Sequence, residues 1–252
     1  MENWLRGFYG VVDVRAGGDC DEAVRLADAL IAGGARVVQL RMKGASTHEF
    51  FVVGTCLRQL TAQAGVALVV NDRIDVARAV EADGVHLGQD DLPLAAARMA
   101  SAPPRSARVG TDLVIGISTH TMAQVKAAAA AGADYLGFGP VFATRTKANP
   151  DPVQGLAALA KAVALAHPVP VVAIGGITPD NVAQVAATGA RAACAISSVN
   201  NAADVTRAAA HIAGAFALTP TRFPLHQDVG DFVVEHGKLE GLVEVSVDSV
   251  KR

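Results

Sequence analysis

The sequence predicts an α/β fold, a closed (β/α)8 TIM barrel in which eight parallel strands alternate with eight helices. Buried-strand and amphipathic-helix patterns alternate eight times between residues 8 and 217. The 252 residues suit one large core, and 51% of them are hydrophobic but 4% aromatic, as expected for parallel strands under alanine-rich helices. No GxGxxG follows the first strand, which disfavours an open doubly wound sheet.

Hydrophobic periodicity and turn residues place each element in chain order. The predicted strands cover residues 8–13, 36–41, 66–70, 84–87, 113–117, 135–138, 169–174 and 191–196. The predicted helices cover residues 20–32, 47–64, 73–82, 92–100, 120–131, 153–166, 179–188 and 202–217, the seventh with Thr178 as its cap and Pro179 as its first residue. A segment rich in proline, serine and arginine, 100–112, is an expected exposed loop.

This pattern divides the chain into a barrel domain, residues 1–218, and a C-terminal extension, residues 219–252. The extension contains no ninth strand–helix repeat. Residues 242–247 alternate like a half-buried strand, and 232–234 could pair with them. We expect the extension to pack on the barrel or on a neighbouring subunit without a chemical role.

Charge and composition exclude several classes of function. The formal net charge is −2 without a basic tract, which gives no reason to expect nucleic-acid binding. No run approaches the roughly 20 apolar residues that span a bilayer, and the N-terminal stretch lacks a signal-peptide core, so we expect a cytoplasmic protein without membrane partners. Cys20, Cys56 and Cys194 show no CxxC spacing. We expect thiols of a reducing compartment, neither a zinc site nor disulfides.

Two acidic pairs follow neighbouring strands. Asn71 and Asp72 end the strand 66–70, and Asp90 and Asp91 follow the strand 84–87 after a Gly-Gln pair. Adjacent parallel strands end at the same edge, so Asp72 and Asp91 should lie together. Either acid alone is more simply explained as a helix N-cap. The pair, with the Asn71 amide beside it, predicts a hard oxygen site for one Mg²⁺ that carries a phosphate.

Cationic side chains follow the second strand. Gln39, Arg41 and Lys43 alternate toward one side, which is the barrel interior, and two cations there are costly to bury unless an anion meets them. Solvated residues paired with nearby acids are the alternative. After the fifth strand, Ser118 can donate to a phosphate oxygen or cap the next helix. His120 is treated as structural, because a histidine at a helix start more often is.

Glycine-framed loops follow the sixth, seventh and eighth strands. Gly137 and Gly139 would let a ligand approach the backbone, and the loop beyond them could close over a ligand as a lid. That loop offers two hydroxyls and a mobile cation, Thr144, Thr146 and Lys147. Gly176 and Ser197 stand where barrels usually bind phosphate through backbone N–H groups.

The rim therefore carries two predicted anion sites. One is cationic and metal-assisted, and the other is neutral and built from backbone. The first suits a departing diphosphate and the second a monophosphate handle. Since no activated serine, cysteine or lysine nucleophile is evident, we expect direct transfer between two substrates.

Five segments resemble the thiamine phosphate synthase (thiamine-phosphate pyrophosphorylase) family in the same order: QLRMK, VVNDRIDVARAVEADGVHLGQDDLP, GISTHT, DYLGFGPVFATRTK and VVAIGGITPDNV. The resemblance implies Mg²⁺-dependent transfer of the hydroxymethylpyrimidine group from its diphosphate to the nitrogen of thiazole phosphate. It implies that Mg²⁺ is bound by Asp72 and Asp91. The thiazole nitrogen attacks without losing a proton, so no general base is needed. In three places the chain departs from the family: Val12-Asp13 stands where a Thr usually precedes the acid, the 100–112 loop is longer than usual, and the C-terminal extension is additional.

The resemblance also assigns the substrate-binding residues. Those implied for the pyrimidine diphosphate are Gln39, Leu40, Arg41, Met42, Lys43, Asn71, Ser118 and Lys147, with Arg41, Lys43, Ser118 and Lys147 as the catalytic set. Those implied for the thiazole phosphate are Thr144, Arg145, Thr146, Gly176, Ile196 and Ser197.

Two other functions compete with this one. A thiazole tautomerase would keep the barrel and use His120 as a proton shuttle, but would not need the diphosphate apparatus. A non-catalytic phosphate-ligand sensor would bind its ligand in the presence of EDTA and release it unchanged. In all three cases the expected partners are small molecules, and the sequence is compatible with a homo-oligomer.

Overall fold

The structure is a computed structural model that describes residues 4–101, 112–144, 151–216, 234–235 and 238–239. Within these residues a closed barrel of eight parallel strands is formed, in which each strand pairs with the next and β8 pairs with β1. The strands are β1 (Gly7–Asp13), β2 (Ala35–Arg41), β3 (Ala67–Asn71), β4 (Gly84–Leu87), β5 (Val114–Thr119), β6 (Tyr135–Phe138), β7 (Val171–Ile174) and β8 (Ala192–Cys194). The predicted fold class is confirmed.

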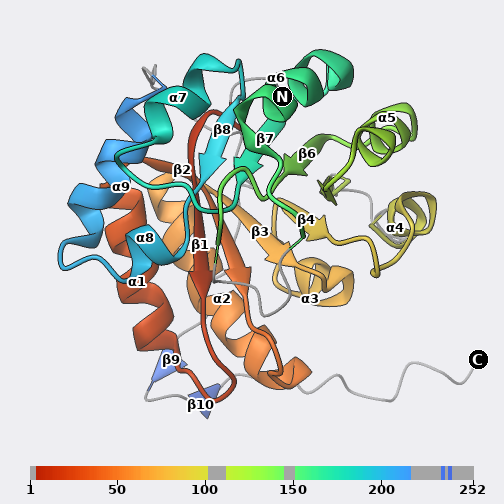
Figure 1. The fold of residues 1–252 in the computed structure, drawn as a ribbon. Coiled ribbons are helices and arrows are strands. Elements are labelled where there is room, and N and C mark those ends of the chain that lie inside the picture. Colours follow the sequence, from red (N-terminus) through yellow and green to blue (C-terminus); the bar gives the residue numbers. More distant parts are fainter. Residues whose placement is uncertain (1–3, 102–111, 145–150, 217–233, 236–237, 240–252) are drawn as a thin grey trace, which may run out of the picture.

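Helices surround the strands on the outside of the barrel (Figure 1). They are α1 (Cys20–Ala32), α2 (Thr47–Ala64), α3 (Ile74–Ala79), α4 (Leu94–Ser101), α5 (Met122–Ala130), α6 (Gly155–Ala166), α7 (Val182–Ala187), α8 (Ser197–Asn200) and α9 (Val205–Gly214). None of the helices in the described part of the chain is long and apolar enough to span a bilayer.

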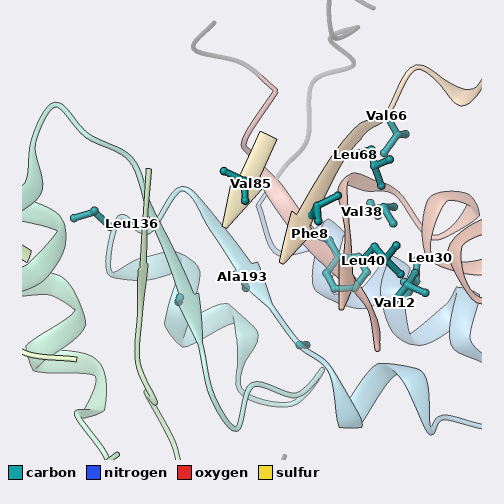
Figure 2. Packing of buried hydrophobic residues seen from close by; sticks show 14 of the residues in the cluster. Phe8, Val12, Leu30, Val38, Leu40, Val66, Leu68, Val85, Leu136 and Ala193 are labelled. Carbon is teal, nitrogen blue, oxygen red and sulfur yellow. The ribbon is translucent and has the colours of Figure 1, made fainter. Parts of the chain in front are cut away.

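Side chains that alternate along each strand divide the core into two hydrophobic clusters. On β2, Val38 and Leu40 belong to the outer cluster between strands and helices, whereas Val37 belongs to the cluster inside the barrel. Figure 2 shows Leu30 of α1 in the outer cluster with Val12 of β1 and Leu40 of β2. Each fully buried large aliphatic side chain stabilises the fold by about 1.5–3 kcal/mol, so the outer cluster fixes the helices on the barrel.

Several predicted boundaries differ from the observed ones for local reasons. The seventh strand begins at Val171, not 169, because Val169 still donates to Ala166 at the end of α6 and the following Pro170 has no N–H. The seventh helix begins at Val182, so Thr178 is not its cap. The eighth strand ends at Cys194, two residues before its predicted end. The chain then forms α8, an additional short helix that the sequence analysis did not predict.

The loops after β1 and β2 are tied together by Glu49 in the first turn of α2. Its carboxylate and Ser46 form a capping box, with the Ser46 hydroxyl accepting from the Glu49 backbone N–H. The same carboxylate accepts from the backbone N–H of Gly17 at 3.0 Å. One side chain therefore stabilises α2 and also holds two loops at the carboxyl edge of the barrel.

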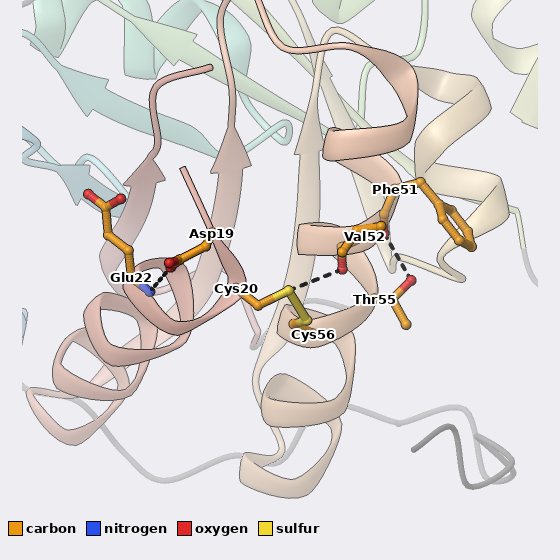
Figure 3. Close-up of a disulfide and its surroundings, with 7 residues drawn as sticks. All are labelled: Asp19, Cys20, Glu22, Phe51, Val52, Thr55 and Cys56. Carbon is orange, nitrogen blue, oxygen red and sulfur yellow. Dashed lines mark hydrogen bonds between the residues drawn. A yellow bond between two sulfur atoms is a disulfide. The ribbon is translucent and has the colours of Figure 1, made fainter. Parts of the chain in front are cut away.

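The expectation of three free thiols is wrong for two of the cysteines. Cys20 of α1 and Cys56 of α2 form a disulfide, with their Cα atoms 6.1 Å apart (Figure 3). The two cysteines are 36 positions apart in sequence, and the packing of α1 beside α2 brings them together. Spacing motifs cannot reveal such a pair. Cys194 is a buried free cysteine on β8.

Part of the C-terminal extension forms a two-stranded antiparallel sheet. Its strands are β9 (Val234–Glu235) and β10 (Lys238–Leu239). The first of these overlaps the predicted strand 232–234 by one residue. The predicted strand 242–247 lies outside the described residues.

Candidate active site

Arg41 and Asp13 form a polar pair at the carboxyl edge of the barrel. They are the last residues of neighbouring strands and lie opposite each other in the register. The Arg41 guanidinium donates to Asp13 Oδ1 at 2.6 Å, and the two side chains remain 24% and 27% exposed. The alternative considered for Arg41, pairing with a nearby acid, is thus present. A single acid uses one of five guanidinium N–H donors, so others remain for an anion.

Lys43 and the two acids predicted to bind metal form the neighbouring cluster. Lys43 Nζ makes an ion pair with Asp72 Oδ2. Asp72 has a left-handed backbone, with φ at 63°, and its backbone N–H donates to the His86 oxygen at 2.9 Å. Arg73, which makes no side-chain cap, occupies the N-cap of α3. The helix-cap explanation for Asp72 is therefore wrong.

Asp91 contacts Asp72 and stands in the loop that follows the next strand, β4. Its carboxylate accepts from the Gly88 N–H at 2.6 Å, which folds the loop after β4 back on itself. Burial raises the pKa of Asp91 above its usual range, and the Asp72 carboxylate raises it further, against the effect of the Gly88 hydrogen bond. The two acids that the sequence placed on adjacent strand ends therefore interact directly.

The two carboxylates fit a divalent cation such as Mg²⁺. Burial first and the Asp72 carboxylate second raise the pKa of Asp91, and a cation bound by both acids would offset this unfavourable charge. In the described residues, no group of three or more His, Cys, Asp or Glu side chains gathers at one point. The protein would thus supply two carboxylates, and water and substrate oxygens would complete the shell, which is usual for Mg²⁺.

Ser118 near the end of β5 is tied to the same region. Its backbone oxygen accepts from Gln89 Nε2 at 2.6 Å, and Gln89 stands in the loop that carries Asp91. Its hydroxyl oxygen lies 2.9 Å from His86 Nε2. Thr121 caps α5, so the alternative in which Ser118 only caps that helix is wrong. Asn71 is partly buried at the end of β3, opposite His86 in the strand register.

A chain of polar side chains, most of them buried, lies in the barrel interior. Gln39 Nε2 donates to the Tyr9 hydroxyl at 2.9 Å, Tyr9 and Tyr135 hydroxyls are 2.9 Å apart, and the Tyr135 hydroxyl is 3.0 Å from His86 Nδ1. Burial raises the pKa of both tyrosines above the usual range and lowers the pKa of His86 to about 4. All three groups are therefore neutral near pH 7. The predicted inward direction of Gln39 is confirmed, since it reaches Tyr9 in the interior cluster.

The loops after β7 and β8 form a second polar corner. Gly176 has φ of 64°, and a Cβ there would lie 2.4 Å from the Ala143 oxygen, so only glycine fits. The Asn181 amide donates to the Gly176 oxygen at 3.0 Å, and the Ser198 hydroxyl donates to the Ile177 oxygen at 2.7 Å. The Asn181 bond holds the β7 loop to the start of α7, and the Ser198 bond joins that loop to α8, the short helix that begins at Ser197. A glycine loop beside a short extra helix is the usual barrel phosphate site.

Gly137 in β6 and Gly139 just after it make room for neighbouring protein atoms. A Cβ on Gly139 would lie 2.0 Å from the Ile174 oxygen, and one on Gly137 would lie 3.2 Å from His86 Cε1. The interpretation of both glycines as openings for a ligand is therefore corrected, because neighbouring protein atoms fill the space. Thr144 is partly buried at the end of the described loop. The predicted ligands Arg145, Thr146 and Lys147, with most of the predicted lid, lie outside the described residues.

Two apolar members of the predicted set do not present their side chains at the rim. Leu40 and Met42 are buried in the outer cluster, 0% and 4% exposed. These two residues could meet a substrate through backbone atoms alone. Ile196 is partly buried and packs against the interior cluster. His120 Nδ1 lies 2.7 Å from the Gly139 oxygen, a contact that accounts for it structurally.

Sequence reasoning missed five residues of the site: Tyr9, His86, Tyr135, Asn181 and Ser198. The first three stand at interior positions of strands and contact one another from β1, β4 and β6. Polar residues at inward strand positions were the available signal, and that signal was applied to Gln39 but not to these. No local pattern marks Ser198, because its partner lies 21 positions away.

The chain is similar to known proteins over most of its length. Residues 8–199 match the family model described as thiamine monophosphate synthase. The chain is 48% identical over 213 residues to a thiamine-phosphate synthase of Anaeromyxobacter dehalogenans, covering 84% of this chain and 88% of that protein. It is 41% identical over 209 residues to the thiamine-phosphate synthase of Moorella thermoacetica, covering 83% and 94%. The solved thiamine phosphate pyrophosphorylase of Pyrococcus furiosus superimposes with a TM-score of 0.72 at 35% identity, covering 85% of this chain and 96% of that one.

Proposed function

The chain belongs to the thiamine monophosphate synthase family, and from this premise we propose that its rim joins hydroxymethylpyrimidine diphosphate to thiazole phosphate. The products are thiamine phosphate and diphosphate. The observation that carries the proposal is the meeting of cations and acids from adjacent strands: Arg41 with Asp13, Lys43 with Asp72, and Asp72 with Asp91. Such a cluster suits a leaving group that gains negative charge.

Departure of the diphosphate is the step that the rim assists. Arg41 and Lys43 stand at the end of one strand and can exchange their present carboxylate partners for oxygens of the diphosphate. Ser118 offers a hydroxyl from β5. Lys147, predicted from sequence, would add a third cation. As the C–O bond breaks, the aminopyrimidine stabilises the positive methylene carbon and these donors stabilise the negative diphosphate.

Asp72 and Asp91 are the proposed ligands of one Mg²⁺, which would supply positive charge to the departing oxygens. Before the diphosphate binds, Asp72 also positions Lys43 through their ion pair. Gln39 lies at the inner side of β2, and Asn71 lies at the end of β3. We propose that both meet the pyrimidine and orient its ring.

The second polar corner, formed by the loops after β7 and β8, is the proposed site of the second substrate, and we call it the phosphate corner. Backbone N–H groups around Gly176 and at the start of α8 at Ser197 are proposed to bind the thiazole phosphate, with Thr144 and Thr146 closing the other side. Held by its phosphate, the thiazole presents its nitrogen lone pair to the methylene carbon. No proton leaves in this step, in keeping with the neutral, hydrogen-bonded state of His86.

A two-substrate assay tests this function. Purified protein is incubated with both substrates, with Mg²⁺ or with EDTA, and thiamine phosphate and diphosphate are measured. We expect both products in equal amounts with Mg²⁺ and neither with EDTA. Isomerised thiazole phosphate without thiamine phosphate would support the tautomerase instead. Recovery of both substrates unchanged would support the sensor.

Three further expectations belong to this proposal. The activity is proposed to operate in the cytoplasm. The partners are proposed to be the two small substrates, in a chain that could form a homo-oligomer. Residues 219–252 are proposed to be an extension outside the catalytic barrel, since the family match covers residues 8–199.

A further inference from the structure

The polar chain in the barrel interior connects the two ends of the proposed pyrimidine diphosphate site. It begins at Gln39, passes through the Tyr9 and Tyr135 hydroxyls to His86, and ends at Ser118. Its four heavy-atom distances lie between 2.9 and 3.0 Å. Five strands contribute one residue each, β2, β1, β6, β4 and β5. We call these five residues the interior relay.

The barrel is built around the rings of this relay. A Cβ on Gly116 would lie 2.0 Å from Tyr135 Cζ, and a Cβ on Gly137 would lie 3.2 Å from His86 Cε1. Trp4 packs edge-on against Tyr135, with the ring centroids 6.1 Å apart and the planes at 89°. Glycines thus leave room for both rings, and an indole closes one side. The rings have little freedom to turn away from their partners.

The hydrogen-bond inventory gives the relay a direction. The Gln39 amide nitrogen can only donate, so the Tyr9 oxygen accepts from it. In one order, Tyr9 donates its hydroxyl hydrogen to the Tyr135 oxygen, and Tyr135 in turn donates to His86 Nδ1. The imidazole proton is then on Nε2, which donates to the Ser118 oxygen. In the opposite order, the buried Tyr9 hydroxyl hydrogen would have no acceptor among the contacts of the described residues. An unpaired buried donor is unfavourable, which selects the first order.

We propose that Tyr9, Tyr135 and His86 are positioning residues that turn the Ser118 hydroxyl hydrogen outward, toward the departing diphosphate. Because His86 Nε2–H occupies an acceptor position on Ser118 Oγ, the serine hydrogen remains for a phosphate oxygen. The relay also couples Gln39, beside the proposed pyrimidine, to Ser118, beside the proposed diphosphate. This inference rests on the proposed role of Ser118 in binding the diphosphate.

The histidine tautomer is the direct structural test. Protein labelled with ¹⁵N in its histidine rings is studied by NMR, and the His86 signals are assigned by their loss in His86→Gln. We expect the proton on Nε2, with Nδ1 unprotonated. A proton on Nδ1 instead would reverse the relay, make Ser118 donate to His86, and overturn the proposal.

A matched pair of variants separates the two ends of the imidazole. The amide nitrogen of Gln at position 86 can reach the place of Nε2 and donate to Ser118, whereas Asn reaches only the place of Nδ1. Both variants lack the imidazole ring, so both lose its packing contacts. We expect kcat to fall at least about tenfold further in His86→Asn than in His86→Gln, with similar KM values for the pyrimidine diphosphate. Equal losses of kcat would overturn the proposal.

A double-mutant cycle separates this inference from the proposed function. Ser118→Ala should lower kcat by about 10²-fold if Ser118 stabilises the leaving group. Tyr135→Phe keeps the packed ring and breaks the relay, so we expect roughly a tenfold loss of kcat in the wild-type background and none in Ser118→Ala. If Ser118→Ala has no effect, both the role of Ser118 and the relay fail. If the two losses multiply, the relay fails while the role of Ser118 stands.

Discussion

Asp72 and Asp91 place two carboxylates together in the free protein. Burial and the neighbouring charge of Asp72 raise the pKa of Asp91, so the folded state resists its ionisation. Lys43 offsets part of this charge through Asp72. Functional sites often hold groups that the fold alone would not favour. Asp72 and Asp91 are therefore residues at which we expect function and stability to favour different side chains.

Replacing Asp91 by asparagine should change activity and stability in opposite directions. The amide removes a proposed metal ligand, and we expect kcat to fall by about 10²–10³-fold. It also removes the repulsion, so the melting temperature in metal-free buffer should rise. Asp90→Asn, at the exposed neighbouring position, is the matched control and should change neither quantity. A metal-free melting temperature that falls in Asp91→Asn would contradict this account of the acids.

His86 should make stability depend on pH. Its pKa is lowered from 6.5 to about 4 in the folded protein, so the unfolded chain binds more protons between these values. The stabilisation from neutral His86 is present above about pH 6.5 and is lost as the pH falls toward 4. Between about pH 7.5 and about pH 5, this group should lower the free energy of unfolding by about 2 kcal/mol.

The measurement is urea unfolding of the wild type and of His86→Gln at these two pH values. Other acids titrate in both proteins, so the difference between them isolates His86. We expect the variant to lose less stability on acidification than the wild type. Identical pH dependence in the two proteins would show that the imidazole is solvated.

At the level of single residues, the sequence predicted some of the contacts at the rim and few of those in the interior. The inward direction of Gln39 and the meeting of Asp72 with Asp91 followed from strand alternation and parallel pairing, which are local rules. Tyr9, Tyr135 and His86 were missed because aromatic residues on strands are equally typical of an apolar core. Their polar atoms find one another across three strands, which no local pattern encodes.

A buried ion pair links helix α2 to β3 and to the residue before β4. Arg58 of α2 is 2% exposed and donates to Asp83 Oδ2 at 2.8 Å, before β4. Asp83 also accepts from the Leu68 N–H at 2.8 Å on β3. Arg58 Nε and Nη2 have no hydrogen-bond partner among the described residues. The pair thus links a helix to two strands but leaves part of the guanidinium unsatisfied.

Asp83→Asn should destabilise the protein strongly. The amide oxygen can still accept from Leu68, but Arg58 keeps a buried charge without a counter-charge, which costs about 3–5 kcal/mol. Asp75→Asn is the control, because Asp75 is 60% exposed in its ion pair with Arg73 and should contribute less than about 1 kcal/mol. Urea unfolding measures both. Equal losses would show that burial of the Arg58 pair has no special effect.

The disulfide between α1 and α2 should stabilise the barrel. It closes a loop of 36 residues, for which loss of unfolded-state entropy amounts to about 4 kcal/mol. Oxidised protein should therefore unfold at higher urea concentration than reduced protein, and a Cys20→Ser, Cys56→Ser double variant should not respond to reductant.

Counting reactive thiols checks the pairing independently. Burial raises the pKa of Cys194 to about 12, so native oxidised protein should show no reactive thiol. After unfolding, oxidised protein should show one reactive thiol. Reduced protein should show three reactive thiols, one for each cysteine. Three reactive thiols in unfolded, unreduced protein would refute the disulfide.

At the level of elements, the sequence located all eight strands and eight of the nine helices of the described barrel. Boundaries failed where long-range bonds intervene. Strand β8 ends early because the chain turns so that Ser198 reaches Ile177 and the Asn200 amide donates to the Val11 oxygen at 2.9 Å. The Cys20–Cys56 pairing failed for the same reason, since it depends on how two helices pack.

For the whole molecule, barrel closure is what turns scattered residues into one site. Each strand delivers its last residues to the same edge, so groups from β1 to β5 meet there although they are spread from Asp13 to Ser118. The loops after β7 and β8 add the phosphate corner, joined by the Ser198 bond. The fold class could be predicted because eight repeats leave few topologies. The orientation of Leu40 and Met42 toward the helices also follows from closure.

The central claim is that one rim holds the departing diphosphate and the thiazole phosphate side by side. A crystal structure of the protein with Mg²⁺, diphosphate and thiazole phosphate tests it most directly. We predict diphosphate in contact with Arg41, Lys43 and Ser118, Mg²⁺ on Asp72 and Asp91, and the thiazole phosphate at Gly176 and Ser197. Diphosphate bound away from Arg41 and Ser118, or Mg²⁺ bound without either aspartate, would contradict the account.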